Sequence, residues 1–184
     1  MTRWTALLLG AALVSAASCS SAPPPQARNL GMPKSGSYVD GSAAHAYSSL
    51  KELAHDASAV VRLSFTGQVT VEHVGTAPFS VNVMHVDQVL RGSLPSITVK
   101  LRTLGAPPGS TEASGATTLT QGVSYIVFVT PFTFGPGSTT DQYVIVGGRA
   151  GLFRVDQGNV VRLDHDSTQL PASLPVSDFE NRLS

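Results

Sequence analysis

The chain has few of the residues that would assign it to a common functional class. It has one cysteine, and charged residues make up 13% of its 184 residues, with 12 Lys and Arg against 12 Asp and Glu. A single cysteine excludes an internal disulfide framework. The basic residues are not clustered, which argues against nucleic acid as a partner. Beyond the N-terminus, no apolar run approaches the roughly 20 residues that a membrane-spanning helix needs.

Motifs of the common enzyme classes are also missing. The chain has no Gly-x-Ser-x-Gly nucleophile elbow, His-Glu-x-x-His zinc helix, phosphate loop or dinucleotide fingerprint. Gly147–Gly151 is rich in glycine but lacks the fingerprint spacing, so it predicts a tight connection between strands. We therefore expect no cofactor. An enzyme is the less favoured alternative, because its site would have to be assembled by the fold from dispersed residues.

Residues 1–18 have the pattern of a secretory signal peptide. Arg3 supplies one positive charge, residues 4–14 are apolar, and residues 15–18 are small. The apolar stretch is too short to span a bilayer. The pattern predicts export and removal of this segment. No twin-arginine pair precedes the apolar stretch, so it indicates the general secretory route.

Cys19 follows directly after these small residues. The stretch Ala16–Cys19 resembles the lipobox of bacterial lipoproteins, although the family favours Leu at the position of Ala16. The resemblance implies that the Cys19 thiol receives a diacylglyceryl group and that the mature chain begins at this residue. Two or three acyl chains anchor a protein more firmly than one, so we expect attachment to the outer face of the cell membrane. The alternative is an ordinary signal peptide with an incidental cysteine.

The rest of the chain divides into a linker and one domain. Residues 19–42 are rich in Pro, Ser and Gly without an apolar period, which predicts a flexible tether. Residues 43–184 form a single β-rich domain in this interpretation. A short helix is expected from Ala43 or Ser48 to Asp56, and a second near the C-terminus, with a capping box formed by Ser177 and Glu180.

Between the two helices the apolar pattern has a period of two. It is clearest from Val61 to Glu72, where Gly67 predicts a bend or bulge. A phase shift between Val83 and Leu90 predicts another bulge. Further strands are expected at residues 97–101, 125–129, 143–146, 152–155 and 160–163, with Ile97 facing inward and Arg102 facing solvent. The fold class is therefore mainly β: a small antiparallel OB-like barrel or bent sheet with a short helix near each end.

The stretch from Asp56 to Phe132 resembles netrin-like domains, the OB-type barrels shared by tissue inhibitors of metalloproteinases and complement C-terminal domains. The resemblance is carried by four segments: Ala57–Val61, Val81–Gly92, Ile97–Val99 and Leu119–Ile126. It implies the fold alone. Those families rely on disulfides, and their metalloproteinase inhibitors use a free N-terminal cysteine, for which the lipid-modified Cys19 is no equivalent.

Few side chains suggest site chemistry. His85 and Asp87 share one face of an expected strand, which is consistent with a metal-ligand pair or a structural His–carboxylate contact. One such pair supplies at most half of a zinc site. Asp164, His165 and Asp166 are consecutive, so their side chains diverge in an extended segment and are expected in a solvated loop.

The sequence therefore favours a non-catalytic binding module, anchored through lipid on Cys19, with an envelope protein as its possible partner. The loops Gly105–Gly122 and Phe132–Thr140 are candidate contact surfaces. Two alternatives stay open: a cell-envelope hydrolase with a dispersed site, and a carrier that holds a hydrophobic ligand inside the barrel.

Overall fold

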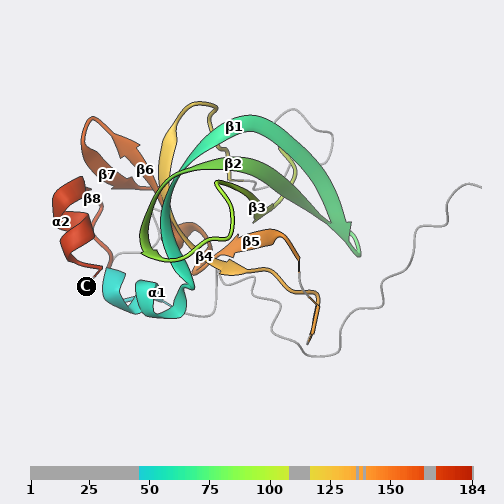
Figure 1. Ribbon diagram of the computed structural model, residues 1–184, viewed down its shortest axis with the longest axis horizontal. Coiled ribbons are helices and arrows are strands. Elements are labelled where there is room, and N and C mark those ends of the chain that lie inside the picture. The colour runs from blue at the N-terminus through green and yellow to red at the C-terminus, as the bar shows by residue number, and fades with distance from the viewer. Residues whose placement is uncertain (1–45, 108–116, 136, 139, 164–168, 184) are drawn as a thin grey trace, which may run out of the picture.

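The computed structural model describes residues 46–107, 117–135, 137–138, 140–163 and 169–183. The described part is mainly β with a short helix near each end, as the sequence predicts (Figure 1). No helix in these residues is long and apolar enough to cross a membrane. The elements are α1 (Leu50–Asp56), β1 (Ala59–Val74), β2 (Ala77–Gly92), β3 (Thr98–Leu104), β4 (Ser124–Pro131), β5 (Gln142–Ile145), the 3₁₀ turn η1 (Gly148–Gly151), β6 (Leu152–Asp156), β7 (Asn159–Arg162), β8 (Ser173–Pro175) and α2 (Val176–Asn181).

The strands form one eight-stranded sheet in the order β1-β2-β3-β5-β4-β6-β7-β8. Strand β1 also pairs with β4, so β1, β2, β3, β5 and β4 follow one another in a partial ring. The expectation of a purely antiparallel sheet is wrong, because β3 and β5 are parallel. The reason is geometric: strand directions cannot alternate all the way round a ring with an odd number of strands.

Bulges bend the two long strands that begin the ring. The register between β1 and β2 shifts between Phe65 and Val69, around Gly67 with its φ of 91°, which confirms the predicted irregularity. In β2 the register skips Asp87 and Leu90. An extra residue in one strand of an antiparallel pair raises the local twist. These bulges bend and twist the β1–β2 pair along the partial ring.

The sheet divides at β4. Strand β5 pairs with the C-terminal end of β4, whereas β6 pairs with its N-terminal half and continues into β7 and β8. The segment Gly147–Gly151 makes the corner between β5 and β6, as expected for a tight strand connection. At Gly151, an added Cβ would lie 2.1 Å from the Val146 carbonyl oxygen, so the chain approaches itself too closely there for a larger residue.

The helix boundaries follow local capping only in part. The Ser49 side chain accepts a hydrogen bond from the Glu52 N–H at 3.2 Å and caps α1. At α2 the predicted capping box is wrong, because the helix begins at Val176, with Pro175 before it, and Ser177 lies within it. The apolar face of α2 still packs as predicted, with Phe179 and the following Leu183 buried.

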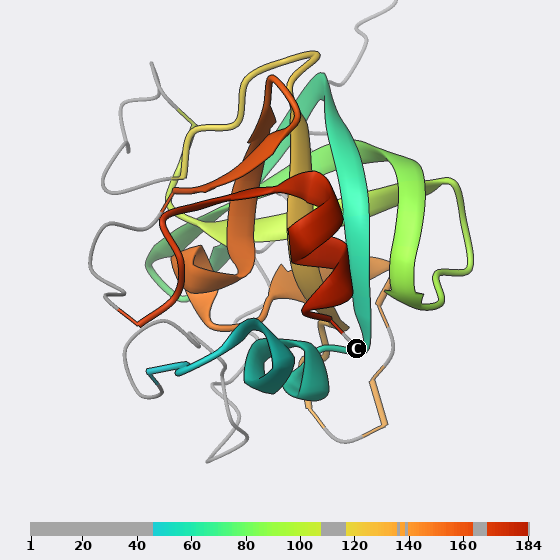
Figure 2. The ribbon, with the colours of Figure 1, turned by 90° about the vertical axis from the view of Figure 1, so that its left-hand side faces the viewer.

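Two groups of buried side chains lie on opposite faces of β4. One fills the interior of the partial ring, and the other lies under α1 and α2, on the side seen in Figure 2. In β4, Val127 and Val129 point into the ring while Ile126 and Phe128 point toward the helices. This explains why the strand is apolar on both faces. The helix-side group includes Tyr47, Leu50, Leu53, Val60, Ile126, Phe128, Phe153, Val160, Phe179 and Leu183.

Candidate functional site

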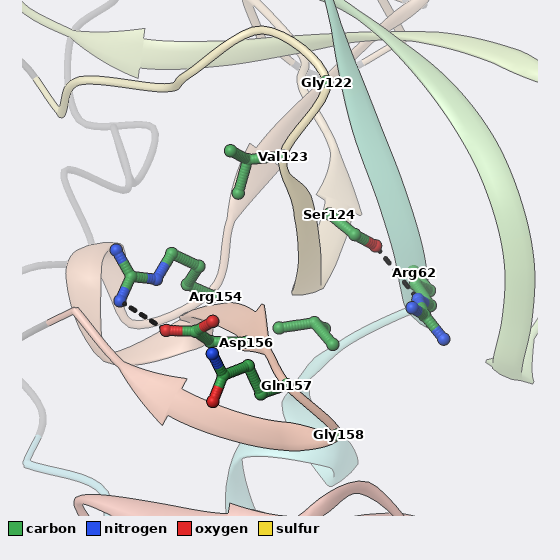
Figure 3. Close-up of a pocket in the computed structure, with 9 residues that line it drawn as sticks. Arg62, Gly122, Val123, Ser124, Arg154, Asp156, Gln157 and Gly158 are labelled. Atoms are coloured by element: carbon green, nitrogen blue, oxygen red, sulfur yellow. Dashed lines mark hydrogen bonds and ion pairs between the residues drawn. The ribbon is translucent and has the colours of Figure 1, made fainter.

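A shallow pocket of about 490 Å³ lies beyond the apolar helix-side face, between β1, β4 and the β6–β7 hairpin (Figure 3). On β1 this face passes from buried Val60 to Arg62 and then Ser64. The sheet surface is therefore apolar under the helices and polar at the pocket. The pocket is lined by Arg62, Gly122, Val123, Ser124, Arg154, Val155, Asp156, Gln157 and Gly158.

Arg62 is held at one side of the pocket by a neighbouring strand. Its Nε donates a hydrogen bond to Ser124 Oγ at 2.9 Å, and Figure 3 shows the two side chains meeting across the strands. Because the contact uses Nε alone, it fixes the direction of the side chain and leaves the Nη groups available for other acceptors. A positioned guanidinium of this kind suits a carboxylate or a peptide carbonyl.

Asp87 extends this polar contact to a third strand. Its carboxylate accepts from Ser64 Oγ at 2.9 Å and from Ser124 Oγ at 3.4 Å. Asp87 is two residues after His85, which pairs with Ser64, so its side chain lies on the face of the sheet that carries both serines. Arg62, Ser124, Asp87 and Ser64 thus form a continuous polar chain across β1, β2 and β4.

The order of contacts in this chain differs from that of a nucleophilic triad. In a triad, an imidazole stands between the carboxylate and the serine. Here Asp87 accepts directly from Ser64 and Ser124, while His85 lies opposite Ser64 in the register and is exposed. Among the described residues, no group of three His, Cys, Asp or Glu side chains is placed to hold a metal ion. The arrangement orients Arg62 through Ser124.

The opposite side of the pocket is the β6–β7 hairpin. Arg154 Nη2 and Asp156 Oδ2 are 3.1 Å apart, and both side chains are about half exposed. The turn residues Gln157 and Gly158 have φ values of 47° and 81°, the left-handed pair that a tight two-residue hairpin requires. Asp156 pairs with Asn159, so this turn joins the strands expected at residues 152–155 and 160–163 directly into a hairpin. The pocket therefore has charges of both signs at the hairpin and a cation opposite.

A second polar cluster contradicts a prediction from the sequence. Arg102 was expected in solvent, but it is buried at 3% exposure on the outer face of β3. Its guanidinium carbon lies 4.4 Å from the centre of the Phe79 ring and 4.5 Å from that of Phe132. Its Nη1 donates to Glu72 at 2.6 Å and to Gln142 at 2.9 Å. The segment after β4 covers this face, which the alternation within β3 could not reveal.

A neighbouring expectation is also wrong. Ile97 was assigned to the interior, yet it is 72% exposed because β3 begins one residue later, at Thr98. Val99 and Leu101 are buried in the ring as expected. Ile97 contributes its carbonyl oxygen, which accepts from the Val86 N–H at 2.8 Å.

Several predicted features lie outside the described residues. They include Cys19, the signal segment, the tether before residue 43, and Asp164, His165 and Asp166. The two candidate contact loops are described only in part. At the ends of the first loop, Ala106 is fully buried and Leu119 is 9% exposed, so these residues pack with the domain.

Two ionisable groups away from the pocket have shifted pKa values. Burial, and then a hydrogen bond to Asp56 at 3.2 Å, raise the pKa of Tyr47 to about 12. The Lys100 ammonium, 2.6 Å from Asp141, lowers the pKa of that carboxyl group. Neither group lines the pocket, so these shifts concern stability rather than site chemistry.

Arg62, Ser124 and Arg154 could not be identified as a group from the sequence. One signal was available in β1: the face that carries buried Val60 continues with the polar residues Arg62 and Ser64. The comparisons add no precedent, since no protein-family model, curated protein or solved structure matches the chain.

Proposed function

We propose that the protein is a lipid-anchored, extracytoplasmic binding module that captures an envelope protein partner in the pocket between β1, β4 and the β6–β7 hairpin. The observation that carries the proposal is the polar chain that fixes Arg62 beside Ser124 at the pocket. A guanidinium held in one direction loses less conformational freedom on binding a carboxylate or carbonyl group. The open, shallow shape suits a protein surface better than an enclosed small molecule.

The proposed fold of the domain is a five-stranded barrel of the OB type, similar to netrin-like domains. Its support is the pairing order β1-β2-β3-β5-β4, the return of β4 to β1 and the parallel β3–β5 pair. The ring interior holds a continuous group of buried apolar side chains that includes Leu63, Met84 and Leu101. This packing favours a binding surface on the outside over a hydrophobic ligand carried inside.

The location is proposed from the sequence. A signal peptide over residues 1–18, lipid on Cys19 and a tether to residue 42 would hold the domain at the outer face of the cell membrane. Labelled fatty acid tests this part directly. We expect the native chain to incorporate label and enter the detergent-rich phase, and Cys19→Ser to do neither. A native chain without label would leave the pocket proposal standing but remove the anchor.

Partner capture tests the pocket. A photo-crosslinking amino acid at Gln157, which is exposed at the hairpin, is expected to capture one envelope protein on intact cells. The matched control places the same amino acid at exposed Lys51 on α1, away from the pocket. Arg154→Ala combined with the probe at Gln157 should lower the yield severalfold. Equal capture from both probe positions would show that the pocket is not the contact surface.

The hydrolase alternative has one supporting observation, the proximity of Asp87 to two serine hydroxyl groups. Without an imidazole between carboxylate and serine, the arrangement lacks the general base that activates such a nucleophile. Ester or peptide hydrolysis by the purified chain that is abolished by Ser64→Ala or Ser124→Ala would favour this alternative over the binding module.

A further inference from the structure

The buried guanidinium of Arg102 has hydrogen-bond donors that nothing in the described structure uses. Both N–H groups of Nη1 are occupied, because Nη1 donates to Glu72 Oε2 at 2.6 Å and to Gln142 Oε1 at 2.9 Å. Nε and Nη2 are also buried, but within the described residues they have no hydrogen-bond partner. Buried polar groups are rarely left unpaired, so this side of Arg102 requires an explanation.

The two unused nitrogens form one edge of the guanidinium. Nε–H and the nearer N–H of Nη2 point in the same direction, because the group is planar. A carboxylate accepts from such an edge with both of its oxygens, through two parallel charge-assisted hydrogen bonds. Glu72 and Gln142 bind Nη1, which is not part of this edge. The part of Arg102 left unused is therefore the part that best fits a carboxylate.

Three phenylalanine rings surround the guanidinium. Its carbon lies 4.4 Å from the ring centre of Phe79, 4.5 Å from that of Phe132 and 5.8 Å from that of Phe134. Phe79 and Phe132 are buried, whereas Phe134 is 44% exposed. Apolar surroundings strengthen a charge-assisted hydrogen bond and favour a ligand with an apolar body. Of the three rings, Phe134 is the one that separates Arg102 from solvent.

Phe134 is held less firmly than Phe132. The Phe132 N–H donates to the Gln142 carbonyl at 2.8 Å, and the Phe132 carbonyl accepts from Thr140 Oγ1 at 2.5 Å. The Phe134 backbone makes no hydrogen bond to any described residue. Its ring meets that of Phe132 edge-on, with the two centres 4.8 Å apart. The Phe134 ring can therefore move while Phe132 stays in place.

We infer that Arg102 forms a binding site for the carboxylate group of a ligand with an apolar body, and that Phe134 covers this site. The carboxylate pairs with Nε and Nη2, and the apolar body takes the place of the Phe134 ring against Phe132. Glu72 keeps its bond to Nη1, and because its side chain is 39% exposed, its charge stays partly hydrated. None of these residues lines the pocket beside Arg62, so the inference does not depend on the proposed function.

Benzoate is a suitable probe for this site, and side-chain NMR detects its binding. In the full chain carrying Cys19→Ser, which removes the proposed lipid attachment, benzoate should shift the Arg102 Nε resonance until saturation. Arg102→Met assigns that resonance by its loss. Followed at the backbone amide of Gln142, this variant should bind benzoate roughly tenfold more weakly. Benzamide has the same ring without the charge, so we expect the native site to bind it roughly tenfold more weakly than benzoate.

Phe134→Ala tests the cover by a gain of binding, which a damaged fold would not produce. Removal of the ring uncovers the guanidinium, so the affinity for benzoate should rise severalfold. The matched control is Ile97→Ala, which removes a 72% exposed apolar side chain just before β3. We expect this control to leave the affinity unchanged.

The outcomes that would overturn the inference are distinct. An Arg102 Nε resonance that benzoate does not shift would exclude a carboxylate site and favour a bound water at this edge. Equal affinity for benzoate and benzamide would exclude recognition of the charge. Equal binding of benzoate by Arg102→Met and the native chain would place the ligand elsewhere. Unchanged affinity in Phe134→Ala would show that this ring does not cover the site.

Discussion

Arg102 Nη1 lies 2.6 Å from Glu72 Oε2, although the Arg102 side chain is 2% exposed and the Glu72 side chain is 39% exposed. The Glu72 carboxylate on β1 thus neutralises the buried Arg102 guanidinium on β3. Arg102 Nε and Nη2 are buried without a hydrogen-bond partner in the described structure, between the rings of Phe79 and Phe132. The aromatic faces compensate part of this loss through cation–π attraction.

Removing the Glu72 carboxylate, whose partner is buried, should destabilise the domain more than removing a carboxylate whose partner is exposed. We expect Glu72→Ala to lower the free energy of unfolding by about 3 kcal/mol, because it leaves an uncompensated buried charge. The control is Asp141→Ala, which breaks the exposed Lys100–Asp141 pair and should cost less than about 1 kcal/mol. Urea unfolding of both variants measures the difference.

The double variant Glu72→Ala/Arg102→Met separates charge from packing. Methionine keeps much of the apolar contact with Phe79 and Phe132 and removes the buried charge. We expect the double variant to be more stable than Glu72→Ala alone. If it is less stable, the guanidinium contributes through its remaining contacts rather than through the pair with Glu72.

Gly147 is required by both backbone conformation and space. Its φ is 68°, and an added Cβ would lie 2.7 Å from Cε2 of Tyr47. Gly158 has a φ of 81° but has no atom within 4 Å of an added Cβ, so it is a matched control for backbone strain alone. We expect Gly158→Ala to cost about 1 kcal/mol and Gly147→Ala clearly more. Equal melting temperatures would mean that Tyr47 moves aside without cost.

Tyr47 should make stability fall at alkaline pH. Its pKa is raised to about 12, so the folded chain retains the phenol proton to higher pH than the unfolded chain, whose tyrosine titrates near 10. The unfolded state loses this proton first, and stability therefore falls as the pH rises from about 10 to about 12. Thermal unfolding of Tyr47→Phe across this interval should show a smaller fall than the native chain.

These features mark what the sequence could predict. The alternation from Val61 to Glu72 and the glycine at position 67 are local signals, and they correctly placed β1, one of the two long strands, and its bulge. The burial of Arg102 was not predictable in the same way. It depends on Phe132, which is thirty positions later and reaches the outer face of β3 only because β5 returns beside β3.

The pocket could not be predicted from the sequence for a related reason. Arg62, Ser124 and Arg154 belong to β1, β4 and β6, and only the pairings of β4 with both other strands bring them together. Asp87 joins them from β2, where alternation places it on the face of His85, and only the pairing of His85 with Ser64 shows that this is the face of the polar chain. Local periodicity specifies which residues are strands, but non-local pairing specifies which of them meet.

Asp87 and His85 provide the sharpest test of how the pocket works. Asp87→Ala removes the acceptor that positions Ser124 and, through it, Arg62, so capture by a crosslinking probe at Gln157 should fall severalfold. His85→Ala is the matched control, because His85 is exposed on the same strand and makes no described contact with this polar chain. We expect it to leave capture unchanged. Loss of capture with His85→Ala but not with Asp87→Ala would contradict the positioning role and direct attention to the imidazole as a ligand or base.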